Sequence, residues 1–204
     1  MKYFIPIFFS VTLFFVACTI QSPDRLADYP SITEIFTEQE VLDLQTLLDS
    51  FEQEIGIQAD ASPETRVARY SVFNTQVLAS MEEGNLHNHP LSNEQKIKLL
   101  DVLHLSTFRS IWSLGSGVRL IEDLKNRPVI TFDIHTIGKF TVLLAELEKE
   151  YPQFSGLTDE LQRAGGLTPH FVVALFLQND KLNMRDARVR LIYVISCLQG
   201  DWQN

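Results

Sequence analysis

Cysteine is almost absent from this chain, whose 204 residues include only Cys18 and Cys197. Such a sequence has no disulfide scaffold of the kind that holds many small secreted domains together. Cys197 lies within the apolar run Leu191–Leu198, where we expect it to be a small buried hydrophobic side chain. The fold must therefore depend on its hydrophobic core.

Basic residues are also fewer than acidic ones. Lys and Arg number 17 against 26 Asp and Glu, which gives a formal charge of −9 at pH 7. Because an acidic protein repels nucleic acid and anionic lipid head groups, this charge argues against binding to either. The same charge favours a basic protein partner, although an acidic balance also serves solubility alone.

Motifs that dictate a chemistry are missing as well. The segment Ser113–Gly117 lacks the Gly-x-Ser-x-Gly spacing of a nucleophile elbow. Neither its glycines nor Gly165 and Gly166 are followed by the Gly-Lys-Ser/Thr of a phosphate-binding loop. We therefore expect no cofactor, and the sequence favours a role other than catalysis.

The chain begins with a basic residue, Lys2, followed by the apolar segment Tyr3–Val16. This segment is shorter than the ~20 residues of a membrane-spanning helix and is typical of a secretory signal. Its end, Phe15-Val16-Ala17-Cys18, resembles the lipobox of bacterial lipoproteins, in which small residues precede an invariant cysteine. Phe15 departs from the leucine that is usual in that family.

The resemblance implies that a peptidase removes residues 1–17 and that Cys18 carries diacylglycerol as the first residue of the mature chain. A membrane contact through two or more acyl chains is durable. We therefore expect a lipid-anchored protein of the cell envelope, on the periplasmic side of the outer membrane if the cell is Gram-negative. An ordinary signal peptide cut after Ala17, or an uncleaved anchor helix, are the alternatives.

The rest of the chain predicts a tether and an all-α domain. Residues 18–35 contain two prolines and no clear periodicity, so we interpret them as a flexible tether that spans up to roughly 55 Å when extended. Residues 36–204 predict a single multi-helix domain, either an orthogonal bundle or stacked helix pairs.

Capping signals and apolar periodicity locate the helices of this domain. Capping boxes at Thr37–Glu40 and Ser92–Gln95 and the pair Ser62-Pro63 predict three helix starts, the second capping box leading into a helix as far as Leu114. Val118–Leu124 predicts a short helix, Pro128–Phe132 is ambiguous, and Asp133 is expected to cap a helix through Leu147. Two almost wholly apolar runs, 171–177 and 191–198, belong in the centre of a bundle.

Two histidines in one loop are the candidate metal ligands. His87 and His89 are two residues apart, with Glu82 and Glu83 just upstream, so a zinc or copper ion could be held between them. A structural metal site needs four ligands at recognisable spacing, and none is complete here. An exposed polar loop is the simpler interpretation.

Two further sets of residues are candidates for catalysis or binding. Asp133 and His135 would share a face in a strand and could act as a general base and its orienting partner. Arg185 and Arg188 are three residues apart and could share a helix face that grips an acidic partner. The alternatives are a helix cap at Asp133 and a solvated helix face.

These observations favour a lipid-anchored envelope protein that binds another protein, as an interaction, accessory or immunity/inhibitor protein. One alternative is an envelope hydrolase of cell wall or glycan that uses Asp133 and His135, or Glu82 and Glu83. Another is a small-ligand carrier, suggested by the 14 phenylalanines.

Overall fold

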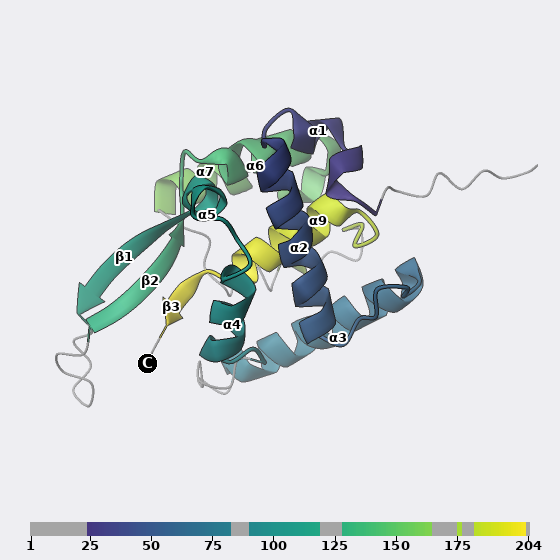
Figure 1. The fold of residues 1–204 in the computed structure, drawn as a ribbon, viewed down its shortest axis with the longest axis horizontal. Coiled ribbons are helices and arrows are strands. Elements are labelled where there is room, and N and C mark those ends of the chain that lie inside the picture. The colour runs from purple at the N-terminus through teal and green to yellow at the C-terminus, as the bar shows by residue number, and fades with distance from the viewer. Residues whose placement is uncertain (1–23, 83–89, 119–127, 165–174, 177–181, 203–204) are drawn as a thin grey trace, which may run out of the picture.

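The computed structural model describes residues 24–82, 90–118, 128–164, 175–176 and 182–202. These residues form a mostly helical body, which confirms the expected fold class, together with one small sheet (Figure 1). In chain order the elements are η1 (Leu26–Asp28), α1 (Pro30–Thr33), α2 (Glu38–Glu54), α3 (Pro63–Glu82), α4 (Asn93–Leu100), α5 (Leu105–Ile111), β1 (Trp112–Val118), β2 (Pro128–Ile134), α6 (Lys139–Glu150), η4 (Pro152–Phe154), α7 (Leu157–Ala164), α9 (Ala187–Cys197) and β3 (Gly200–Trp202).

The predicted capping boxes start α2 and α4. The Thr37 amide donates to the Glu40 carboxylate at 2.7 Å, and the Glu40 amide donates to the Thr37 hydroxyl at 3.4 Å. Ser92 and Gln95 repeat this pattern at the start of α4. Each box satisfies amides that the first helical turn leaves without partners. Gly56 follows α2 with φ of +82°, a backbone conformation that favours glycine and ends the helix.

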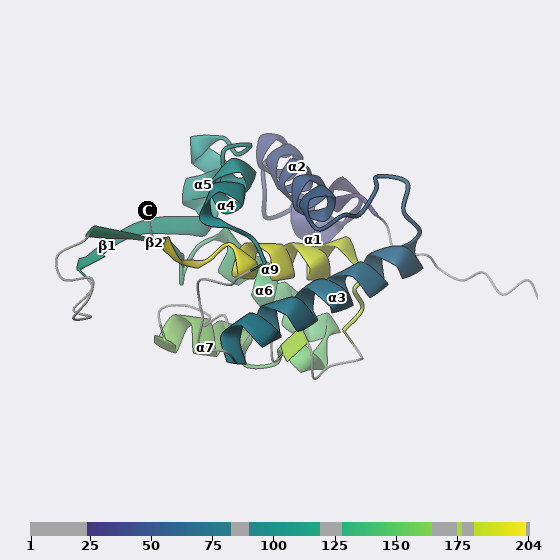
Figure 2. The same cartoon turned by 90° about the horizontal axis from the view of Figure 1, so that it is seen from below.

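Helix α9 forms the centre of the molecule. All of its eleven residues, Ala187–Cys197, are buried. Figure 2 shows α9 as a middle layer, with α2, α4 and α5 on one side and α3 and α7 on the other. The apolar run at 191–198 predicts this position, because a helix that is apolar on every side can only be stable when other elements cover it completely. The other apolar run, 171–177, lies almost entirely outside the described residues.

Aromatic rings join α9 to the helices on both sides of it. The Tyr193 ring meets Tyr70 of α3 edge-on at 5.6 Å between centroids and Phe176 at 4.7 Å. Phe51 of α2 meets Tyr193 edge-on at 6.3 Å and Phe73 of α3 edge-on at 5.4 Å. Edge-to-face contacts of this kind add to the free energy gained by burying the rings.

One long helix was expected between Ser92 and Leu114, and this expectation is wrong. The helix breaks after Leu100, and a strand begins at Trp112. The break has a tertiary cause, because the His104 amide donates to the Asp43 carboxylate of α2 at 3.0 Å and His104 is extended. No glycine or proline marks this position in the sequence.

The sheet is antiparallel with strand order β1-β2-β3. The ambiguous segment Pro128–Phe132 belongs to β2, and Asp133 lies in the same strand, so Asp133 does not cap a helix. Helix α6 starts later, at Lys139, with Gly138 as its N-cap. The short helix expected over Val118–Leu124 is not formed at Val118, which ends β1, and its other residues lie outside the described part.

The expected tether at 18–35 is too long. Leu26, Tyr29, Ile32 and Phe36 are buried in the core, and the Leu26 amide donates to the Gln45 side chain of α2 at 2.8 Å. The folded domain therefore begins by Asp24. Apolar residues spaced three or four apart, as in Tyr29, Ile32 and Phe36, are the signal in this segment that its prolines obscured.

Candidate functional site

Several candidate residues from the sequence lie where the structure gives no side-chain description. Cys18, Glu83, His87 and His89 are outside the described residues, and Glu82 is the last residue of α3. Within the described part of the chain, no three His, Cys, Asp or Glu side chains are grouped so that they could hold a metal ion. The metal-site hypothesis at His87 and His89 stays a prediction.

Asp133 and His135 lie at the end of β2, and both side chains are partly buried. The His135 amide donates to the Ile111 carbonyl at 2.8 Å, and the His135 carbonyl accepts from the Thr141 hydroxyl at 2.8 Å. These backbone bonds fix the turn from β2 into α6. A catalytic role for this pair stays a prediction, as does the carrier hypothesis.

Arg185 and Arg188 do not share an exposed helix face. Arg185 precedes the N-cap residue Asp186, and its guanidinium pairs with Glu64 at 2.8 Å. Arg188 is buried and binds Glu150 through two nitrogens, at 2.8 and 2.7 Å, as well as Asp186 at 2.7 Å. Because buried Asp186 and half-exposed Glu150 pair with the Arg188 guanidinium, whose side chain is only 9% exposed, this arginine is held inside the fold and does not face a partner.

Asp43 and His104 form a pair that the sequence analysis did not find. The Asp43 carboxylate on α2 lies 2.8 Å from His104 Nδ1 at the start of α5. It also accepts hydrogen bonds from the His104 amide, from the Thr107 hydroxyl and from the Gln39 side chain. Asp43 is buried, with its side chain 5% exposed, whereas the His104 side chain is 62% exposed.

The geometry fixes the His104 ring from one side. A carboxylate at Nδ1 orients an imidazole and favours the tautomer that carries its proton there, which leaves Nε2 as an acceptor. Burial raises the pKa of the Asp43 carboxyl, but the hydrogen bonds from Thr107 and His104 outweigh burial and hold that pKa below its ordinary value. The aspartate is therefore ionised at neutral pH, and it presents one oriented imidazole at the surface.

Large apolar side chains flank this pair in sequence. Leu42 precedes Asp43 and is 58% exposed, and Leu105 follows His104 and is 60% exposed. The Gln39 side-chain amide borders the ring: its nitrogen lies 3.2 Å from His104 Nδ1 and donates to the Asp43 carboxylate at 2.9 Å. We call these five residues, Gln39, Leu42, Asp43, His104 and Leu105, the α2–α5 surface.

One sequence signal could have located Asp43. On α2 the buried positions Glu40, Asp43, Leu44 and Leu47 recur at helical spacing, so two carboxylates occupy the face that meets the core. A polar residue on such a face needs a partner from elsewhere in the chain. Glu40 finds Lys139 of α6 at 2.5 Å. The identity of either partner cannot be deduced from α2 alone.

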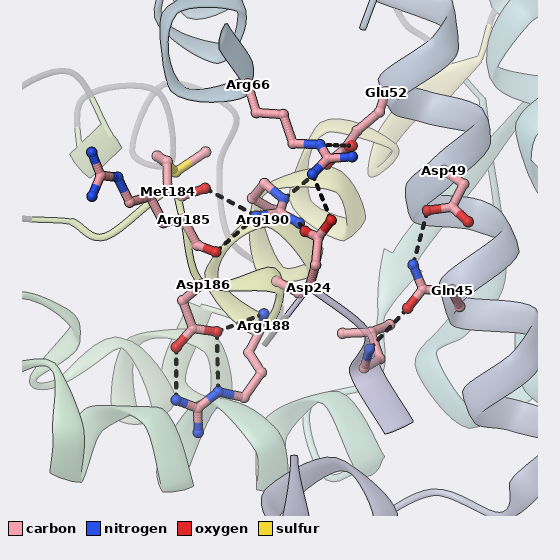
Figure 3. A network of polar contacts seen from close by, with 12 residues as sticks. Asp24, Gln45, Asp49, Glu52, Arg66, Met184, Arg185, Asp186, Arg188 and Arg190 are labelled. Atoms are coloured by element: carbon pink, nitrogen blue, oxygen red, sulfur yellow. Dashed lines mark hydrogen bonds and ion pairs between the residues drawn. The ribbon is translucent and has the colours of Figure 1, made fainter. Parts of the chain in front are cut away.

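A second polar cluster surrounds the start of α9 and is shown in Figure 3. The Asp24 carboxylate binds Arg66 of α3 at 2.5 Å and Arg190 of α9 at 2.6 Å. Glu52 of α2 lies between the same arginines, 3.1 Å from Arg66 Nε and 2.8 Å from Arg190 Nε. The Tyr70 hydroxyl donates to Glu52 at 3.2 Å. We call Asp24, Glu52, Arg66 and Arg190 the arginine cluster.

The arginine cluster is a structural feature that connects four segments of the chain. A buried guanidinium without a partner costs free energy. The guanidinium groups of Arg66 and Arg190 each pair with the carboxylates of Asp24 and Glu52. Arg190 also donates to the carbonyl oxygens of Met184 and Arg185, at 3.2 and 3.0 Å. The cluster therefore fixes the first described residue, Asp24, against α3 and α9.

Comparisons with protein-family models, with curated proteins and with solved structures find no match for this chain. Among the described residues, no helix is both long and apolar enough to cross a bilayer.

Proposed function

We propose that this protein is a lipid-anchored component of the cell envelope that binds another protein through the α2–α5 surface. The observation that carries the proposal is the exposure of Leu42 and Leu105, at 58% and 60%, directly next in sequence to Asp43 and to the His104 imidazole that this buried carboxylate holds in place. Apolar side chains around an oriented polar group are typical of the centre of a protein interface.

Preorganisation supports the same interpretation. Asp43 is held by Thr107, Gln39 and the backbone of α5, so the His104 ring is already ordered before a partner arrives. Binding to an ordered surface costs less conformational entropy than binding to a mobile one. The net charge of −9 further favours a basic partner, whose association would be accelerated and would weaken with added salt.

The resemblance of residues 15–18 to a lipobox supports the anchor, and the burial of Leu26, Tyr29 and Ile32 leaves a shorter linker after it. Only residues 19–23 separate Cys18 from Asp24, which the arginine cluster holds against the body. Six extended steps of the chain reach at most about 20 Å. In this proposal the domain is therefore held close to the bilayer and not at the distance expected of an eighteen-residue tether.

Crosslinking in detergent-extracted envelopes tests the proposed surface. The double variant L42N/L105N removes both exposed apolar side chains, and we expect it to reduce the yield of a specific crosslinked partner by about tenfold, since two interface anchors contribute on the order of 1 kcal/mol or more each. The matched control is V72N, because Val72 of α3 is 49% exposed on another helix.

Two results would contradict the proposal. Equal losses of the crosslinked partner in L42N/L105N and V72N would show that the α2–α5 surface has no special role. Intact-mass measurement of the membrane-extracted protein tests the anchor separately: a chain that begins at Met1, or an unmodified thiol at Cys18, would exclude lipidation.

A further inference from the structure

The sheet projects from the helical body, and β1 forms one of its edges. Figures 1 and 2 both show the β1–β2 hairpin extending beyond the helices. The strand order β1-β2-β3 places β2 in the middle, and in the described part of the chain β1 pairs with β2 alone. The other side of β1 is thus a row of backbone groups with no strand beside it among the described residues.

The register identifies which groups of β1 point toward this open edge. The His135 amide donates to the Ile111 carbonyl at 2.8 Å, one position beyond the Trp112–Ile134 end of the β1–β2 register, so a position that bonds across the ladder falls at 111 and 135. Such pairs alternate along an antiparallel ladder. Residues 113, 115 and 117 therefore bond to β2, and residues 114, 116 and 118 direct their amides and carbonyls outward.

Nothing in the sequence of β1 protects this edge. Proteins usually place lysine, other charged residues or proline on an exposed edge strand, because an open edge recruits other chains. The seven residues of β1, Trp-Ser-Leu-Gly-Ser-Gly-Val, include no charged residue and no proline. An open edge of this length is suited to accept an extended segment by β-strand addition, in which main-chain hydrogen bonds supply the affinity.

We propose that the open edge of β1 binds an extended, basic segment of another protein, which adds to the sheet as a fourth strand. Charge decides between the candidate occupants. A second copy of this chain would bring another net charge of −9 to the edge, and the two copies would repel each other. A segment rich in Lys or Arg would instead be attracted. This site is distinct from the α2–α5 surface, so either proposal can fail alone.

Proline at position 116 tests the edge selectively. S116P removes an amide that points outward, and proline is tolerated on the free side of an edge strand. S116A is the matched control, because it removes the same hydroxyl and keeps the amide. The probe is a short blocked peptide of alternating Lys and Val, applied to the detergent-extracted full chain and followed by fluorescence polarisation; its counterpart alternates Glu and Val.

We expect the Lys-Val peptide to bind the wild type and S116A equally, to bind S116P about tenfold more weakly, and to outcompete the Glu-Val peptide. Equal binding of the Lys-Val peptide to S116P and S116A would overturn the proposal. It would show that net charge alone, and not hydrogen bonding to the β1 edge, attracts the peptide. A mass by light scattering that doubles for the wild type and not for S116P would also overturn it and would assign the edge to a second copy. Circular dichroism of S116P checks that its helices are intact.

Discussion

Asp43 is a single side chain that ties α2 to the start of α5. It is buried and accepts hydrogen bonds from Thr107, Gln39 and the backbone and ring of His104. D43N keeps the shape but loses the charge that strengthens these bonds, so we expect the free energy of unfolding in urea to fall by about 2 kcal/mol. H104A, which removes an exposed partner only, should cost less than about 1 kcal/mol. Equal losses in the two variants would contradict this assignment.

The pH dependence of D43N follows from the same contacts. The folded-state pKa of Asp43 is lowered, so its contribution to stability is present above the ordinary carboxyl pKa of about 4 and disappears as the pH falls through the folded-state value. The difference in unfolding free energy between wild type and D43N should therefore be constant near neutral pH and shrink below about pH 4. A difference that grows on acidification would refute the assignment.

At the scale of elements, local signals predicted the starts of α2, α3 and α4 because their caps involve residues three positions apart. The break between α4 and α5 could not be predicted, because it depends on Asp43, which is 61 residues from His104. The arginine cluster also depends on contacts between residues that are far apart in the sequence, so it could not be predicted either. No residue near Arg190 in the sequence identifies its partner Asp24, which is 166 residues away.

The segment from η1 to Phe36 gives a prediction at the scale of elements. Its side chains Leu26, Tyr29, Ile32 and Phe36 are buried, and full burial of a large apolar side chain contributes about 1.5–3 kcal/mol. Four such residues rival the 5–15 kcal/mol by which domains are usually stable. A chain that starts at Asp24 should melt like the chain that starts at Cys18, and one that starts at Thr37 should show no cooperative transition in calorimetry. Cooperative melting of the chain that starts at Thr37 would show that residues 24–36 are not needed for folding, as the expected tether at 18–35 requires.

At the scale of the whole molecule, the described elements and the proposed anchor together define an orientation. Helix α1, which starts six residues after Asp24, lies on the side of the body away from the β1–β2 hairpin (Figure 1). The linker of residues 19–23 joins the anchor to the end that holds Asp24. The open β1 edge would then face away from the bilayer, where segments of other envelope proteins can reach it.

Energy transfer to labelled lipid head groups measures this orientation. The dye is attached to D28C, because Asp28 is exposed in η1, four residues after Asp24. Cys197 should stay unlabelled near neutral pH, because burial raises the pKa of its thiol to about 12. We expect efficient transfer in the lipidated protein, since the linker limits the separation between Cys18 and Asp24 to about 20 Å. Inserting a dozen Gly and Ser residues after Pro23 should lower the transfer efficiency severalfold while leaving the melting temperature unchanged. Unchanged transfer after the insertion would mean that the domain contacts the membrane by its own surface, and the short linker would no longer account for its position.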